Sequence, residues 1–88
     1  MFTGIVQALV SVESVEDKPG LKTFSVRLPE ALADGVQTGA SIAVNGVCFT
    51  VTRVDGPVVW FDAVKETLEL TNIRYLQSGT RVNVARSF

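Results

Sequence analysis

Alternation of apolar and polar residues is the strongest pattern along this chain. From Val6 to Glu13 every second residue is apolar, and the same period returns over 23–28 and 81–85. A period of two places successive side chains on opposite faces of a β-strand. Each of these runs therefore predicts a strand that turns one face to a core.

Turn residues separate further apolar runs in the middle of the chain. Asn45-Gly46 lies between 41–44 and 47–52, and Asp55-Gly56 comes before 58–64. Asn-Gly and Asp-Gly between β-rich segments favour tight hairpins, because both turn positions must accept a positive φ. Two successive hairpins predict a meander of three strands. The last of them is apolar at both parities, which predicts a strand covered on both faces.

Two segments lose the alternation. Residues 29–35 begin with proline, carry an early acid and end in glycine, which favours one or two helical turns. Within 65–76, Leu68, Ile73 and Leu76 fall on one helical face, which predicts a short helix. Together these elements predict an all-β fold, a six-stranded closed barrel of Greek-key type, since closure removes exposed strand edges. A β-sandwich is the alternative.

Composition narrows the chemistry. A chain of 88 residues suffices for one domain, which we place at 1–88. Its formal charge of −1 and scattered basic residues argue against nucleic acid as a partner. Without histidine and with one cysteine, the chain offers no usual zinc site and no intrachain disulfide. With no basic leader and no membrane-length apolar stretch, we expect a cytoplasmic protein without a membrane partner.

Three segments, taken in order, resemble the riboflavin synthase family. They are Met1–Val6, Gly39–Val51 and Phe61–Leu68, and 79–84 resembles the end of that family's first barrel. The resemblance implies a barrel that occurs twice in the full-length enzyme, each copy binding 6,7-dimethyl-8-ribityllumazine or riboflavin. It also implies dismutation of two lumazines to riboflavin, a transferase reaction of riboflavin biosynthesis without a metal or added cofactor. The reacting pair lies between barrels of two chains, so one barrel supplies half of a site.

The chain departs from this family in two ways. The second barrel is absent from the sequence, so the chain is either an excised domain or a natural single-barrel relative. Two copies sharing the apolar surface left by the missing barrel would form a homodimer, and we expect the isolated barrel to be weakly active or inactive. The residues 85–88 stand where the family more often has a glutamate followed by an arginine, which concerns the barrel's edge rather than its pocket.

The resemblance also implies a set of ligand-binding positions. A flat bicyclic ring needs apolar surface for its faces and a few fixed donors and acceptors for its edges. The implied positions are Gly4, Ile5, Val6, Cys48, Thr50, Asp62, Ala63, Val64, Glu66 and Thr67. Backbone serves at 4–6, Ala63 and Val64, whereas Glu66 and Thr67 offer side chains to the ring edge or the ribityl hydroxyls.

Alternation places Cys48 and Thr50 on one face of their strand, opposite Val47, Phe49 and Val51. The resemblance turns that face to the ligand and gives the Thr50 hydroxyl to the ring edge or ribityl chain. Cys48 is the candidate catalytic nucleophile, although a thiol in an apolar strand holds little thiolate. From propensity alone, Cys48 is a small buried hydrophobe and Thr50 a β-branched strand residue.

Other positions also have a structural alternative. Glu66 and Thr67 suit the start of a helix, where acids are favoured, and Phe2 suits core packing as well as a ligand contact. Three functions therefore compete: half of a lumazine dismutase site, a non-catalytic carrier or fluorescence antenna for lumazine or flavin, and an oligonucleotide-binding barrel. Charge and a low aromatic content disfavour the third.

Overall fold

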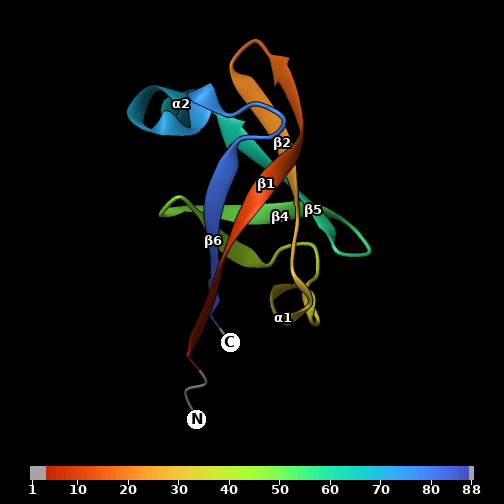
Figure 1. The fold of residues 1–88 in the computed structure, drawn as a ribbon. Coiled ribbons are helices and arrows are strands. Elements are labelled where there is room, and N and C mark those ends of the chain that lie inside the picture. The colour runs from red at the N-terminus through yellow and green to blue at the C-terminus, as the bar shows by residue number, and fades with distance from the viewer. Residues whose placement is uncertain (1–3, 88) are drawn as a thin grey trace.

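Six antiparallel strands close into a barrel in the computed structural model, which describes residues 4–87 (Figure 1). They are β1 (Ile5–Lys18), β2 (Leu21–Arg27), β3 (Ser41–Val44), β4 (Val47–Asp55), β5 (Val58–Val64) and β6 (Arg81–Ser87). Around the barrel their order is β1-β2-β5-β4-β3-β6, with β6 paired to β1. The run β6-β3-β4-β5 is a Greek key, because β6 returns beside β3. The predicted closed barrel is confirmed, and the sandwich is not.

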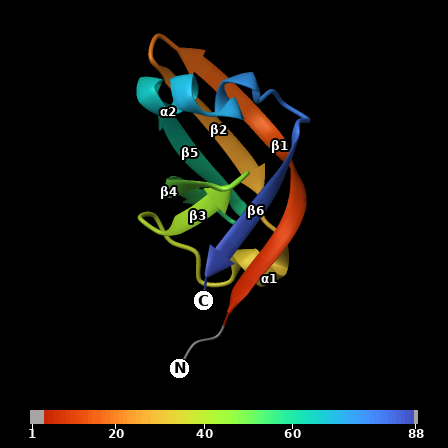
Figure 2. The same ribbon diagram turned by 90° about the vertical axis from the view of Figure 1, so that its left-hand side faces the viewer.

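Short helices lie at opposite ends of the barrel. The helix α1 (Glu30–Ala33) lies near the start of β1 and the end of β6, whereas α2 (Lys65–Leu70) lies at the other end (Figures 1 and 2). A 3-10 helix, η1 (Asn72–Tyr75), follows α2, so the single helix predicted over 65–76 is divided at the extended residue Thr71. Within the described residues no helix is long and apolar enough to cross a membrane.

Three phenylalanines form the centre of the barrel's core. Phe24 on β2, Phe49 on β4 and Phe61 on β5 have ring centroids 5.3 to 5.9 Å apart. Fully burying a side chain of this size contributes roughly 1.5–3 kcal/mol, and aromatic pairs add to this. Phe24 and Phe49 lie on the apolar parity of alternating strands, whereas the sequence of β5 is apolar at both parities and does not distinguish Phe61 from its neighbours.

Lys22 closes the barrel at the end near α2. It lies at the inward parity of β2 and is 4% exposed. Its Nζ donates to the carbonyl oxygen of Leu76 at 2.9 Å and pairs with Asp17 at 3.1 Å. A buried charge is tolerated where it is paired and hydrogen-bonded, so Lys22 ties the segment after η1 to β1 and β2.

Arg86 closes the opposite end. Its guanidinium donates to the carbonyl oxygens of Leu32 and Asp34 at 2.8 and 2.7 Å. Leu32 is the buried residue of α1. The arginine therefore fixes α1 beneath the end of β6.

Strand β1 is longer than its first alternating run predicts. It continues past Glu13 to Lys18, and its pairing with β2 shifts between Val12 and Ser14. A bulge adds one residue and changes the parity of those that follow. Consequently Val12 and then Val15 contribute to the core, a change that one alternating window does not reveal.

The prediction that β5 is covered on both faces is wrong. Its inward side chains are buried, but Trp60 is half-buried and Val64 is 56% exposed. The guanidinium of Arg53 lies 4.4 Å from the centroid of the Trp60 ring. A cation–π contact of this kind shields the ring locally, and no second layer of structure covers this face in the described part of the chain.

Candidate functional site

A shallow groove of about 390 Å³ lies on the outer face of the barrel over β3, β4 and β6. Small side chains make up most of its lining. The lining residues are Ala40, Ser41, Ala43, Cys48, Ala85, Arg86 and Ser87. Ligand pockets commonly hold roughly 300–1,000 Å³, so the groove has the volume for a small heterocycle.

Strand register builds the floor of the groove. Asn45 and Gly46 have φ of 50° and 81°, as a tight hairpin turn requires, and this turn places Ala43 opposite Cys48. Closure of the barrel then places Ala85 of β6 opposite Ala43 on its other side. Three neighbouring strands therefore carry only small outward side chains at this level, which leaves the sheet surface flat.

A row of polar side chains runs beside this floor. Ser41 lies opposite Thr50 across β3 and β4, and Thr23 lies opposite Asp62 across β2 and β5. The buried residues Val51 and Phe61 lie opposite each other on β4 and β5. Thr50 precedes Val51 and Asp62 follows Phe61, so on these antiparallel strands Thr50 and Asp62 lie next to each other on the outer face. The Thr23 hydroxyl donates to Oδ1 of Asp62 at 2.7 Å. Four adjacent strands thus present three hydroxyl groups and one carboxylate in a line.

Cys48 and Thr50 face outward, as the alternation predicts. Both are exposed, whereas Phe49 and Val51 on the other parity are 6% and 1% exposed. The interpretation of Cys48 as a small buried hydrophobe is therefore wrong. The apolar surroundings expected around its thiol belong to the inner face, and the sulfur instead borders the groove.

The predicted residues of β5 point in both directions. Asp62 and Val64 are exposed on the outer face, and Ala63 is 1% exposed with its side chain in the core. Ala63 can therefore meet a ligand only through its backbone, as the resemblance implies. None of the three lines the groove itself.

Glu66 and Thr67 lie in the first turn of α2, which agrees with the alternative that these two residues begin a helix. The carbonyl oxygen of Thr67 accepts a hydrogen bond from the Thr71 hydroxyl at 2.7 Å, and that hydroxyl also accepts from the backbone N–H of Ile73. Thr71 therefore links α2 to η1. Neither Glu66 nor Thr67 is among the groove-lining residues.

The N-terminal segment reaches the edge of the groove. Ile5 is 59% exposed and lies opposite Ser87, a groove residue. Val6 turns its side chain inward. Gly4 has a φ of 100°, and a Cβ there would meet no atom within 4 Å. The positive φ, and not a lack of room for a side chain, therefore favours glycine at this position. Phe2 lies outside the described residues.

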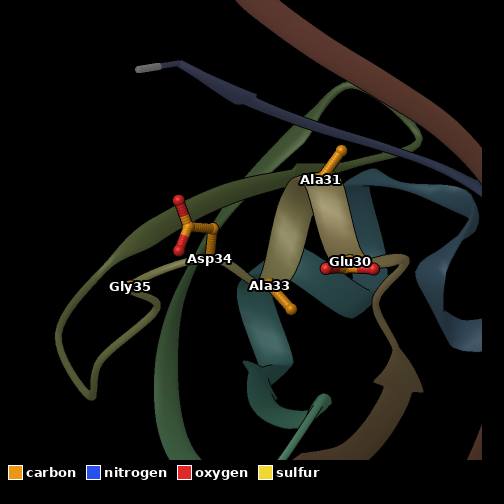
Figure 3. A pocket seen from close by; sticks show the side chains of 5 residues that line it. All are labelled: Glu30, Ala31, Ala33, Asp34 and Gly35. Atoms are coloured by element: carbon orange, nitrogen blue, oxygen red, sulfur yellow. The ribbon is translucent and has the colours of Figure 1, made fainter.

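A second hollow, of about 850 Å³, surrounds α1 (Figure 3). It is lined by one short segment, Glu30, Ala31, Ala33, Asp34 and Gly35. Its labelled side chains project in different directions and do not converge on one point (Figure 3). Binding sites need convergent polar groups, and none of the predicted site residues lies here. Among residues 4–87 no group of three or more histidine, cysteine or acidic side chains gathers to hold a metal.

Sequence reasoning missed several groove residues. Ser41 and Ala43 could have been predicted from the sequence, because a two-residue turn at 45–46 fixes which residues lie opposite Cys48 and Thr50. Ala85 carries no such signal. Its place opposite Ala43 depends on barrel closure between β3 and β6, which a local pattern does not contain.

The chain matches the family model of the lumazine binding domain over residues 3–87. It is 49% identical over 87 residues to riboflavin synthase of Escherichia coli strain K12, covering 99% of this chain and 41% of that protein. It is 36% identical over 85 residues to yellow fluorescent protein of Aliivibrio fischeri, covering 96% and 44%.

A solved structure shares the architecture. LumP complexed with riboflavin matches with a TM-score of 0.83 at 31% identity, over 96% of this chain and 45% of LumP. The chain thus spans less than half the length of these relatives.

Proposed function

We propose, from the premise that this chain belongs to the lumazine-binding domain family, that it binds 6,7-dimethyl-8-ribityllumazine or riboflavin on the outer face of its barrel. The observation that carries the proposal is the flat floor at Ala43 and Ala85, bordered by Cys48 and continuous with the polar row beginning at Ser41 and Thr50. A planar ring needs the first feature and a polyol chain the second.

In this arrangement the ring lies over the small residues, and the Thr50 hydroxyl meets its edge. The ribityl chain runs along β5 toward Asp62 and the start of α2, where Glu66 and Thr67 stand. Backbone at Ala63 and Val64, and at residues 4–6, completes the boundary. Exposed carboxylates and hydroxyls suit a ligand tail that carries several hydroxyl donors.

The groove is open and its volume of about 390 Å³ suits one ring, whereas dismutation needs two lumazines together. We infer that the parent protein is a riboflavin synthase, a transferase that needs no added cofactor, and that this barrel supplies half of its site. The other half comes from a second barrel or a second copy of the chain. Ile5 and Leu9 project outward on β1 on either side of Gln7 and are 59% and 57% exposed, and exposed apolar side chains of this size support a homodimer.

The residues around the groove suit binding better than proton transfer. Dismutation removes a proton from a methyl group of one lumazine while a nucleophile adds to the other. Lys65 lies 3.9 Å from Glu69, on α2 outside the groove, and no acid and base stand within reach of each other in the groove lining. Cys48 is the nucleophilic group that borders it, and we assign it a ligand contact rather than a covalent role.

A non-catalytic carrier or fluorescence antenna is the second candidate function. The similarity to yellow fluorescent protein and to LumP favours it, as does the lack of an acid–base pair in the groove lining. Both functions use the same ligand and the same outer face. They differ only in whether product forms.

One titration separates these functions. Trp60 is the sole tryptophan and stands two residues before Asp62 on the same face of β5, about 7 Å away. Riboflavin or lumazine whose ribityl chain reaches Asp62 holds its ring on the same outer face, close enough to quench the emission of Trp60. Quenching with appearance of riboflavin from lumazine supports the half-site. Quenching without product, at protein concentrations where two copies associate, supports the carrier, and no quenching at saturating ligand contradicts both.

A further inference from the structure

We propose that Thr23 is a positioning residue that orients the Asp62 carboxylate toward the ribityl hydroxyls, an inference that rests on the proposed function. The two residues face each other across β2 and β5. The Thr23 hydroxyl donates to Oδ1 of Asp62 at 2.7 Å. Both side chains lie on the outer face, in the polar row that continues to Thr50.

The hydrogen bond restricts an otherwise mobile group. Asp62 is exposed, and an exposed carboxylate samples several rotamers, whose loss on binding lowers affinity. Threonine is a suitable anchor because branching at Cβ restricts its χ1. Within the described residues this is the carboxylate's one hydrogen bond, so Oδ2 is left to accept from a ligand.

The order of the strands indicates how Thr23 acts. Asp62 is one strand away from Thr50 and the groove, and Thr23 is a strand further out. Thr23 therefore acts through Asp62 rather than by touching the ligand ring. A hydroxyl group bound to a carboxylate forms a charge-assisted bond, roughly twice as strong as a neutral one. The pair thus favours ligands with a polyol chain over the same ring without one.

Two flavins make this selectivity measurable. Riboflavin and lumiflavin share the isoalloxazine ring, but lumiflavin carries a methyl group in place of the ribityl chain. In Thr23→Val we expect the Kd for riboflavin to rise about threefold to tenfold, with the Kd for lumiflavin unchanged. Thr23→Ser keeps the hydroxyl and restores the wild-type ratio of the two Kd values.

Thr52→Val is the matched control. Thr52 is also an outward threonine on the barrel, but its hydroxyl donates to the backbone carbonyl of Trp60 at 3.2 Å, away from Asp62. This variant should leave the ratio unchanged. If Thr23→Val does not fold, as judged by circular dichroism, Thr23→Ala makes the same comparison with a smaller side chain.

A double-mutant cycle tests whether Thr23 acts through Asp62. In the Asp62→Ala background, Thr23→Val should cause no further change in the Kd for riboflavin, because its partner is gone. An additional loss in that background, an equal loss for both flavins, or no loss at all overturns the inference while riboflavin binding by the wild type stands. Failure of the wild type to bind riboflavin overturns the proposed function instead, and this inference with it.

Discussion

Ser41 on β3 lies directly opposite Thr50 on β4, with both side chains on the outer face of the barrel. Directly opposed residues have Cβ atoms about 4.5–5.5 Å apart. The pair therefore brings two hydroxyl groups to one edge of the small-residue groove: Ser41 lines the groove, and Thr50 lies just outside its lining, where the polar row begins. Binding of a ligand ring depends on this edge in our account.

Replacing Thr50 by valine tests that edge. The change keeps the side chain's shape and removes its hydroxyl, so we expect riboflavin affinity to fall by about 1–3 kcal/mol. Equilibrium titration of ligand fluorescence measures the loss. An unchanged affinity, with an unchanged melting temperature, would remove Thr50 from the site.

Filling the groove floor should weaken binding. Ala85→Leu places a branched side chain beside Ala43, where the ring is proposed to lie, and we expect affinity to fall by about tenfold or more because overpacking costs roughly 1–3 kcal/mol. Asn83→Leu is the matched control, since Asn83 is exposed on the same face of β6 and does not line the groove. Equal effects of the two leucines on the riboflavin Kd would place the ring elsewhere.

The Cys48 thiol should report occupancy of the groove. It is exposed and lines the groove, so a disulfide reagent such as Ellman's reagent should modify it in the folded protein. Saturating riboflavin should slow that reaction in proportion to the bound fraction. A rate that is indifferent to riboflavin would contradict the proposed contact, and Cys48→Ser supplies the blank.

Lys22 should matter for stability despite its charge. Lys22→Met keeps much of the apolar stem but leaves the Leu76 carbonyl without its donor, at a cost of about 1–3 kcal/mol in the free energy of unfolding. Its other partner, Asp17, has a side chain that is 71% exposed, so little is lost there. Urea unfolding measures the difference.

Lys18→Met is the control for this prediction. Lys18 pairs with Glu16 at 3.0 Å, with more than half of each side chain exposed. Exposed pairs contribute little, and surface substitutions usually change stability by about 0.5 kcal/mol or less. If Lys22→Met were as mild as Lys18→Met, Lys22 would not be what closes the barrel end.

Local patterns were enough for most of the fold and for one part of the site. The alternation from Val47 to Thr52 placed Cys48 and Thr50 on the outer face, because their parity opposes that of buried Phe49. The Asn45-Gly46 turn marked the hairpin between β3 and β4. These features depend on neighbours in sequence, which a single chain displays directly.

Features that depend on residues far apart in the sequence could not be predicted from local patterns. The bulge in β1 after Val12 changes the parity of everything that follows. Trp60 is shielded by Arg53 on the neighbouring strand rather than by a second layer. Ala85 reaches the groove only because β6 pairs with both β3 and β1. Each depends on how the barrel closes, and closure is a property of the whole chain.

Nuclear magnetic resonance titration of the ¹⁵N-labelled protein with riboflavin tests the central claim most directly. We predict that amide shifts concentrate at residues 41–43, 48–50, 62–64 and 85–87, while those of 30–35 around α1 stay in place. No shift at saturating riboflavin, or shifts confined to the hollow around α1, would contradict a binding face over β3, β4 and β6.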